Sequence, residues 1–315
     1  TGSGMVMLEE AVLRIEEIFG IENVYVITGA HLVDSIREEL PGLSSHVFAE
    51  PTKRNTAGAI VWGMAVVSSL LREEDISFAI IPSDHRIHTA AQFQNKVLEA
   101  LHFAEKNDVL VTIGIPPTRP ETGYGYMELG DPIKKAFQVK RFIEKPDAAK
   151  AEQLVNGGNV LWNSGMFFWH FSTFMNELAA ASPKHFEALQ QIVSAIYRGR
   201  TVEAEIEFGD LPDISIDHVL MEKARHVAVI KADFEWDDLG SWDALGRIHI
   251  ADEAGNAIVG TGEAIEASNN VIYNSNPDQA VQVFGLDEMV VVVTPDAVMV
   301  CPKSRAQEVK KLTRG

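Results

Sequence analysis

The sequence predicts an α/β fold with a mixed, mostly parallel sheet flanked by helices, followed by a small C-terminal β-rich domain. Strand-like and helix-like segments alternate through residues 23–115, which is typical of a sheet covered by helices on both faces. Residues 79–81 are apolar without a break, as expected for a strand buried on both faces. After residue 251 the sequence changes to short strands with Gly and Asn turns. We therefore predict two domains, residues 1–252 and 253–315.

The first half of the chain contains one helix that stands out. Residues 57–71 are apolar nearly all round, so this helix is predicted to be buried. The other expected elements of this half are a helix over 5–19, a strand over 23–28, a helix over 30–40, a strand over 45–48, a strand over 77–81, a helix over 93–104 and a strand over 109–115.

The second half departs from strict alternation. Its expected elements are strands over 124–129, 136–143, 160–171 and 226–232, helices through much of 171–223, short strands after 251 and a final helix over 305–312. The run of four valines at 290–293 is the most apolar of the late strands.

Composition excludes several classes of function. The net charge of −18 disfavours nucleic acid as a partner, because nucleic-acid binding needs a basic surface. A small phosphorylated ligand stays compatible, since it needs only local positive charge. Cys301 is the single cysteine, so an intramolecular disulfide and a cysteine-based zinc site are both excluded. No apolar run reaches the length of a membrane span, and a cytoplasmic location is expected.

The stretch Pro82-Ser83-Asp84-His85 places a carboxylate at the carboxyl end of a buried strand. In open α/β sheets ligands bind at that edge, where one or two carboxylates and substrate phosphates hold Mg²⁺. A structural interpretation is equally open: Asp84 caps the helix after Thr89 or bonds its own backbone.

A second stretch, Glu50 to Ala59, joins a strand to the buried helix. Asn55 or Thr56 is expected to cap the helix, and the small residues that follow allow a flat ligand to approach backbone N–H groups. Lys53 and Arg54 would add positive charge there, or they are simply solvated basic residues.

Three further stretches carry groups suited to a sugar phosphate. Gly123 and Gly125 precede a strand, where the backbone either approaches a ligand or makes a plain turn. Glu144 and Lys145 end another strand and suit hydroxyl and phosphate groups, or are solvated. Asn163 interrupts an apolar run, so it either forms a bulge with internal hydrogen bonds or faces a polar ligand.

Asp237 and Asp238 repeat the pattern of Asp84 near a strand end. Because consecutive side chains in an extended segment point to opposite sides, we expect one of the two to face a cleft. A capped helix start at Ser241 with spare acidic residues is the structural alternative.

Taken together, these stretches resemble the sugar-1-phosphate nucleotidyltransferases, and more closely the mannose-1-phosphate guanylyltransferases (GDP-mannose pyrophosphorylases). Each motif is weak alone, but their shared order over residues 5–312 is specific. The resemblance rests on Glu50 to Ala57, Pro82 to His85, Thr122 to Tyr126, Phe142 to Pro146, Asn163 to Phe167, Trp236 to Trp242, and Thr294 to Lys303. It implies a Rossmann-like nucleotide-diphospho-sugar transferase domain.

The resemblance also implies a role for each candidate residue. Asp84 and Asp238 would hold Mg²⁺, with Asp237 as the reserve, and Lys145 would join these two aspartates in catalysis. The nucleotide would contact Pro51, Arg54, Asn55, Thr56, Ala57, Ser83 and Asp84, with Arg54 to Ala57 on the guanine side. Mannose 1-phosphate would contact Gly123, Glu144, Lys145, Asn163 and Gly165.

The implied reaction joins GTP and mannose 1-phosphate into GDP-mannose, with release of pyrophosphate and no covalent enzyme intermediate. A homodimer is compatible with the resemblance. The alternatives are a guanylyltransferase for another sugar 1-phosphate, and a non-catalytic nucleotide-sugar-binding protein that lacks the triphosphate loop.

The family opens with a strand and a glycine-rich loop that carries an Arg, followed by a Lys, and these wrap the triphosphate. No such loop precedes the helix over residues 5–19. We therefore expect the natural protein to carry this segment before Thr1, and a chain that starts at Thr1 to be inactive.

Overall fold

The structure, a computed structural model, describes residues 5–72 and 76–312. It divides into two compact units, Thr1–Trp236 and Asp237–Gly315, and the division falls inside the short strand β10 (Trp236–Asp237). This point precedes residue 252 because Trp242 and Leu245 pack into the core of the second unit. The start of the chain at Thr1, on which the expectation of a preceding strand and loop depends, lies outside the described residues.

Six strands of unit 1 form one mixed sheet in the order β3-β8-β5-β9-β7-β6, and β6 also pairs with β8. They are β3 (Ser77–Ile80), β5 (Leu110–Ile115), β6 (Tyr126–Ile133), β7 (Ala136–Ile143), β8 (Val160–His170) and β9 (Val227–Lys231). A two-residue strand, β4 (Arg86–Ile87), follows β3 outside this sheet.

The direction of β8 decides the character of this sheet. β8 runs antiparallel to β3, β5 and β6, whereas β5 and β9 are parallel. The predicted class, a mixed α/β sheet flanked by helices, is confirmed. The expectation that this sheet is mostly parallel is wrong for its ladders. Of the ladders of this sheet in the described residues only β5–β9 is parallel, because β8 and β7 each run opposite to the strands beside them.

A separate parallel pair, β1 (Val26–Gly29) and β2 (Val47–Glu50), lies before the main sheet in the chain. The expected strand over 45–48 is shifted because a 3₁₀ helix, η3 (Pro41–His46), precedes β2. A pocket of 440 Å³, lined mainly by apolar side chains, lies between β1 and β3.

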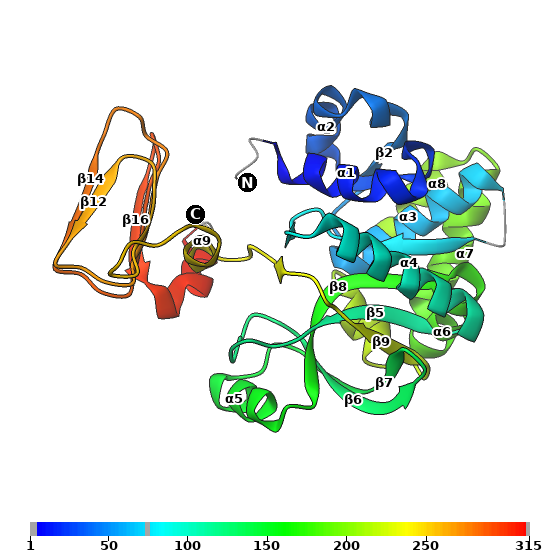
Figure 1. Ribbon diagram of the computed structural model, residues 1–315. Helices are drawn as coiled ribbons and strands as arrows, with labels where there is room; N and C mark the ends of the chain where they lie inside the picture. The colour runs from blue at the N-terminus through cyan, green and yellow to red at the C-terminus, as the bar shows by residue number, and fades with distance from the viewer. Residues whose placement is uncertain (1–4, 73–75, 313–315) are drawn as a thin grey trace. The chain divides into compact units, whose positions relative to one another are not determined.

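Helices cover both faces of the main sheet (Figure 1). The α-helices of unit 1 are α1 (Met7–Phe19), α2 (Val33–Glu39), α3 (Asn55–Leu71), α4 (Ala90–Asn107), α5 (Ala148–Gly157), α6 (Phe171–Ala181), α7 (Pro183–Tyr197) and α8 (Thr201–Gly209). Short 3₁₀ turns η1 (Ile21–Asn23) and η2 (Ala30–Leu32) and a π-helical turn η4 (Asp217–Met221) complete the unit.

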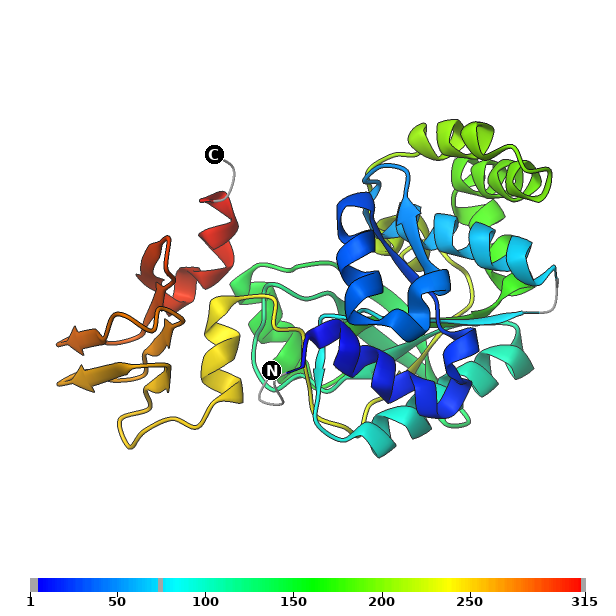
Figure 2. The same cartoon turned by 90° about the horizontal axis from the view of Figure 1, so that it is seen from above.

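The helices form two groups, and each group packs on the sheet through its own apolar core. One core joins α3, α6, α7 and α8 to the face of β8 that carries Phe167 and Trp169. The other joins α4 and α5 to the opposite face, which carries Met166 and Phe168, and α1 packs at its edge. Figure 2 shows α1 and α4 on one side of the sheet and α7 and α8 on the other. Consecutive side chains of a strand point to opposite faces of the sheet, so β8 contributes to both cores. Most residues of α3 are buried, which confirms the predicted burial of helix 57–71.

Unit 2 consists of short strands that pair in parallel, apart from β16, which is antiparallel to β15. A four-stranded sheet has the order β11-β13-β15-β16, and β12 pairs with β14. The strands are β11 (Ala257–Val259), β12 (Gly262–Ile265), β13 (Val271–Asn274), β14 (Val281–Phe284), β15 (Met289–Val293) and β16 (Val298–Pro302). The predicted C-terminal β-rich part is confirmed.

Buried asparagines hold the turns of unit 2. Asn270 Nδ2 donates to Asn256 Oδ1 at 2.9 Å and to the Leu286 carbonyl at 2.7 Å. These bonds satisfy buried polar groups where the chain turns between strands. The helical elements are η5 (Trp242–Ala244), α9 (Leu245–Ile248) and η6 (Lys303–Lys311). The last of these is a 3₁₀ helix where an α-helix over 305–312 was expected.

None of the helices in the described part of the chain combines the length and the apolar character needed to cross a membrane.

Candidate functional site

The turn after β3 exposes Asp84 and buries His85. Ser83 and Asp84 are both exposed, and the Asp84 side chain is 74% accessible. Asp84 Oδ1 lies 3.9 Å from His85 Nε2. The carboxylate therefore lies exposed in the turn that follows the carboxyl end of β3.

Two residues from distant parts of unit 1 hold this turn in place. Arg14 of α1 is buried, and its Nη2 donates to the His85 carbonyl at 3.1 Å. The Trp236 ring meets the His85 ring edge-on, with 5.2 Å between centroids. Burial lowers the pKa of the Arg14 guanidinium, and Glu10 opposes that shift. Sequence reasoning missed Arg14, although a cation inside the apolar stripe of a helix was a visible signal.

Helix α3 begins with a left-handed residue. Asn55 has φ of 57°, and its Oδ1 accepts the Thr56 N–H at 2.9 Å. Among the described side chains none caps the helix at Arg54, so the predicted capping by Asn55 or Thr56 is wrong. Asparagine tolerates the left-handed region because its short amide bonds locally to the backbone, and this local bond replaces the cap.

Arg54 and Thr56 bind the loop that follows α8. Arg54 Nε donates to the Gly209 carbonyl at 3.1 Å, and its Nη2 donates to the same oxygen. Thr56 Oγ1 accepts the N–H of Ile216 at 2.9 Å. We name residues 209–217 the bridging loop. Much of the hydrogen-bonding capacity of Arg54 is therefore used to hold this loop.

The neighbours of these residues differ in exposure. Pro51, directly after β2, is half-buried, whereas Ala57 is fully buried inside α3. A Cβ on Gly58 would lie 2.4 Å from the Cβ of Arg54, so only glycine fits at this point of the helix. The start of α3 is thus a closely packed backbone surface.

Glu144 and Lys145 form an ion pair at the end of β7. Lys145 Nζ lies 2.9 Å from Glu144 Oε1, and Lys145 adopts a left-handed φ of 42°. Such a conformation is unfavourable for lysine and is common at functional sites. A Cβ on Gly125 would lie 2.7 Å from Glu144 Oε2, so the glycine lets the carboxylate lie against the backbone of this segment.

Asn163 and Gly165 form a bulge in β8, where the register with β5 shifts. Asn163 Oδ1 accepts from Thr112 Oγ1 at 3.3 Å and from the Gly165 N–H at 3.2 Å. Gly165 has φ of 71°, and a Cβ there would lie 3.6 Å from Cγ of Pro82. Of the two interpretations, the bulge with internal hydrogen bonds is observed, and it lies beside the turn that carries Asp84.

Asp217 joins this cluster, and sequence reasoning missed it. Asn163 Nδ2 donates to Asp217 Oδ1 at 2.8 Å. Burial raises the pKa of the Asp217 carboxyl, the nearby Glu144 carboxylate raises it further, and the bond from Asn163 opposes both effects. The residue opens the π-helical turn η4, a rare feature that is frequent at functional sites.

Gly123 lies in a loop whose charges are satisfied internally. Its N–H donates to Glu121 Oε1 at 3.1 Å, and Glu121 Oε2 accepts from Arg119 Nε at 3.2 Å. The Arg119 guanidinium lies over the rings of Tyr124 and Trp162, at 5.8 Å and 5.2 Å. The structure brings Gly125 against Glu144.

The two acidic residues of unit 2 have different partners. Arg247 Nε donates to Asp237 Oδ2 at 2.6 Å, and its Nη2 donates to Asp237 Oδ1 at 3.0 Å. Asp238 Oδ1 accepts the Gly240 N–H at 3.1 Å. Arg247 therefore binds both carboxylate oxygens of Asp237.

A divalent cation fits the chemistry of Asp84. Among residues 5–72 and 76–312, no group of three or more His, Cys, Asp or Glu side chains forms a cage for a metal ion. Mg²⁺ does not require such a cage, because it is usually held by one or two carboxylates, water and substrate phosphates. The exposed carboxylate of Asp84 is a ligand of this kind.

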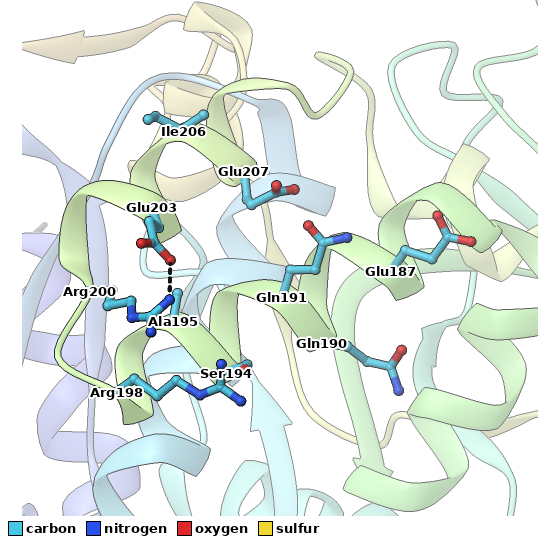
Figure 3. Close-up of a pocket in the computed structure, with 10 residues that line it drawn as sticks. All are labelled: Glu187, Gln190, Gln191, Ser194, Ala195, Arg198, Arg200, Glu203, Ile206 and Glu207. Atoms are coloured by element: carbon cyan, nitrogen blue, oxygen red, sulfur yellow. Dashed lines mark hydrogen bonds and ion pairs between the residues drawn. The ribbon is translucent and has the colours of Figure 1, made fainter.

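Another pocket of unit 1 contains none of the predicted residues. It has a volume of 470 Å³ and lies between α7 and α8 (Figure 3). Arg200 Nη1 bonds Glu203 Oε2 across its rim at 3.2 Å. The paired charges along its wall are typical of a solvated surface groove.

Two family models match the chain. A family model described as Nucleotidyl transferase matches residues 5–255. A second model, described as MannoseP isomerase/GMP-like beta-helix domain, matches residues 262–314.

Curated relatives cover most of the chain. The chain is 34% identical over 314 residues to a mannose-1-phosphate guanylyltransferase of Klebsiella pneumoniae, which covers 97% of this chain and 65% of that protein. It is 37% identical over 290 residues to a mannose-1-phosphate guanylyltransferase of Sinorhizobium fredii, with 90% and 55% covered. The chain thus spans between 55% and 65% of the length of these two relatives.

A solved structure shares the fold. A crystal structure described as mannose-1-phosphate geranyltransferase from Thermus thermophilus is 28% identical, with a TM-score of 0.85. The match covers 99% of this chain and 89% of that chain.

Proposed function

We propose that this chain, which belongs to the nucleotidyl transferase family, transfers GMP from GTP to mannose 1-phosphate and so forms GDP-mannose and pyrophosphate. The names of the curated relatives support the choice of substrates. Because the chain spans only part of their length, the proposal rests on the residues of unit 1.

One observation carries the proposal. The bulge with Asn163 and Gly165 lies between the Glu144–Lys145 pair and the turn that carries Asp84. The groups proposed to bind sugar and phosphate therefore lie on one side of the bulge, and the turn with the carboxylate proposed to bind a cation lies on the other. This arrangement suits a transfer between two phosphorylated substrates better than the binding of a single ligand.

The reaction is a displacement at phosphorus. An oxygen of the mannose 1-phosphate group attacks the α-phosphorus of GTP, and a new P–O bond forms. The bond from the α-phosphorus to the bridging oxygen breaks, and its electrons leave with pyrophosphate. The protein's task is to align the two substrates and to balance charge, without forming a covalent bond to either.

On the sugar side, Lys145 binds the phosphate of mannose 1-phosphate through its ammonium group. Glu144 accepts hydrogen bonds from sugar hydroxyls. Its ion pair with Lys145 also fixes the position of the lysine ammonium group. Gly123, Asn163 and Gly165 complete the sugar-phosphate side in this proposal.

On the nucleotide side, the start of α3 offers the positive end of the helix dipole. The N–H groups of Thr56 and Ala57 are already bonded, to Asn55 Oδ1 and to the Ile214 carbonyl. Pro51 and the residues Arg54 to Ala57 shape the guanine side, and Ser83 and Asp84 lie near the phosphates. The bridging loop joins the two sides, since Thr56 holds its backbone at Ile216.

Mg²⁺ would supply charge neutralisation on the phosphates as pyrophosphate leaves. Asp84 is the residue of unit 1 proposed to hold it. Asp238 is the ligand proposed in unit 2, on the basis of its sequence motif.

The proposal extends to the setting of the protein. GTP-dependent synthesis of a nucleotide sugar is consistent with the cytoplasm, and a homodimer is the proposed assembly. Both stay predictions, which fractionation and light scattering of the natural protein test.

A product assay tests the function. The full-length protein, incubated with GTP, Mg²⁺ and mannose 1-phosphate, is expected to release GDP-mannose and pyrophosphate in equal amounts. Preferred turnover of another sugar 1-phosphate would change the assigned substrate. Binding of GDP-mannose without any turnover would identify a nucleotide-sugar-binding protein instead.

A further inference from the structure

Two carboxylates and an ammonium group converge beside the bulge of β8. Glu144 pairs with Lys145 at 2.9 Å, and Asp217 lies close enough to Glu144 for each charge to affect the other. Lys145 also acts on the Asp217 charge, so one ammonium group faces two carboxylates. A half-buried carboxylate in such a cluster is suited to bind a ligand that brings further hydrogen-bond donors.

The contacts of Asp217 leave acceptor positions open. Asn163 Nδ2 engages one oxygen, Oδ1, at 2.8 Å, and the residue is half-buried. An ionised carboxylate has about four lone-pair positions, so the Asn163 amide and the residue's own backbone N–H leave capacity for further hydrogen bonds. Burial and the Glu144 charge raise the pKa of this carboxyl, a cost that a hydrogen-bond donor from a ligand would offset.

The bridging loop fixes where Asp217 lies. Ile216, the preceding residue, donates its N–H to Thr56 Oγ1 at 2.9 Å. Arg54 binds the other end of the loop at the Gly209 carbonyl. The start of α3 therefore holds the backbone before Asp217, and Asn163 holds its side chain.

We propose that Asp217 is a specificity-determining residue, which accepts a hydrogen bond from a hydroxyl of the sugar ring beside Glu144, with Asn163 as the residue that positions it. This inference rests on the proposed function, and it names a residue of the sugar site that no sequence motif indicates. Asn163 then acts on the sugar through Asp217, since its own carbonyl oxygen is already bonded to Thr112 and Gly165.

The chemistry predicts discrimination among sugars. A site built to bond a hydroxyl rejects an analogue without it, because the buried acceptor is left unpaired. Two neighbouring carboxylates can read two hydroxyls of one ring, and so distinguish epimers that differ at either carbon. The ligand class is therefore a hexose 1-phosphate with free ring hydroxyls.

The test compares the wild-type protein with Asp217→Asn. The asparagine keeps an acceptor for Asn163 but loses the carboxylate. Each protein is assayed with GTP and with mannose 1-phosphate or its 2-, 3-, 4- and 6-deoxy analogues. In the wild type, removal of one hydroxyl is expected to lower kcat/KM by about 10- to 100-fold. For the hydroxyl that Asp217 binds, the loss of kcat/KM on removal of that hydroxyl should be at least about fivefold smaller in Asp217→Asn than in the wild type. The KM for GTP should change less than about twofold.

Two further variants separate recognition from structure. Asp213→Asn removes an exposed carboxylate from the same loop and should leave every penalty unchanged. Asn163→Ala should reduce the penalty at the same hydroxyl as Asp217→Asn, because Asp217 loses the donor that positions it. A purely structural role for Asp217 would lower activity with all sugars in equal proportion.

The outcomes are distinguishable from those of the proposed function. If the wild type makes GDP-mannose and the deoxy penalties are the same in Asp217→Asn, the inference is overturned and the function stands. If the wild type makes no GDP-mannose, the function is overturned, and calorimetric binding of mannose 1-phosphate to the same proteins then decides the inference. Equal affinity in wild type and Asp217→Asn, or no binding at all, would overturn it.

Discussion

The sugar-phosphate side of the site contrasts with the nucleotide side. On the sugar side, Glu144 contacts Lys145 and Asn163 contacts Asp217 through charged and polar side chains. On the nucleotide side, Arg54 is bonded to a backbone carbonyl, and Asp84 points into solvent. A network of side chains that is formed without ligand fixes affinity and selectivity, whereas an exposed carboxylate contributes when substrate and cation are present. Substitutions on the two sides should therefore alter different kinetic constants.

The largest expected effect concerns the base. We expect kcat/KM with GTP to exceed that with UTP by about 10³- to 10⁴-fold, because a base that leaves hydrogen-bonding groups unpaired is rejected. Steady-state kinetics with both nucleotides measure the ratio. Lys53→Ala, an exposed neighbour of Arg54, is the matched control and should keep it. Similar efficiencies with the two nucleotides would contradict a guanine-selective α3 start.

The exposed carboxylate gives the next largest effect. Asp84→Asn should lower kcat by about 10³-fold, because charge on the leaving phosphates is no longer neutralised. Asp238→Asn should do the same, while Asp237→Asn should lose much less, since Arg247 already holds that carboxylate. Thermal unfolding of each variant controls for loss of a turn or cap. Small and equal decreases of kcat in all three variants would contradict the assignment of Asp84 and Asp238 as Mg²⁺ ligands.

A selective effect on one substrate is expected at Lys145. Lys145→Met should raise the KM for mannose 1-phosphate by about 100-fold, because a charge-assisted bond to phosphate is lost. The KM for GTP should change little. Lys140→Met removes an exposed lysine of β7, the strand that precedes Lys145, and serves as the matched control. Parallel increases in both KM values would mean that the two sides are not separate.

The smallest effect is on stability. Burial and Glu144 raise the pKa of Asp217, so the native state binds this proton more tightly than the unfolded state does. The contribution of Asp217 to stability is therefore present at low pH, below about 3.9, and is lost as the pH rises through the raised pKa. Asp217→Asn should raise Tm at pH 7, and its advantage should shrink on acidification. Differential scanning calorimetry at several pH values measures this, and an advantage that grows toward low pH would show the opposite sign.

The sequence predicts local features of the fold well. The buried helix α3 is predicted because residues 57–71 are apolar nearly all round, and the β-rich character of unit 2 is predicted from its short strands with Gly and Asn turns. The reverse direction of β8 could not be predicted, since strand direction depends on connections that span the whole unit. Asn55 was misjudged because a cap and a left-handed start use the same residue type.

The site divides in the same way. Glu144, Lys145 and Asn163 carry local signals, namely charges at a strand end and a polar residue in an apolar run. Asp217 lies 54 residues from its partner Asn163, and its segment is indistinguishable from an ordinary helix start. Arg14 likewise acts on His85 across 71 residues, so only the fold reveals either contact.

A crystal structure of the full-length protein with GDP-mannose and Mg²⁺ tests the central claim most directly. We predict hydroxyls of the mannose ring within hydrogen-bonding distance of Glu144 and Asp217, the sugar phosphate at Lys145, and guanine at the start of α3. A ligand bound in the groove between α7 and α8, or a mannose ring that does not contact the Glu144–Asp217 pair, would contradict this account.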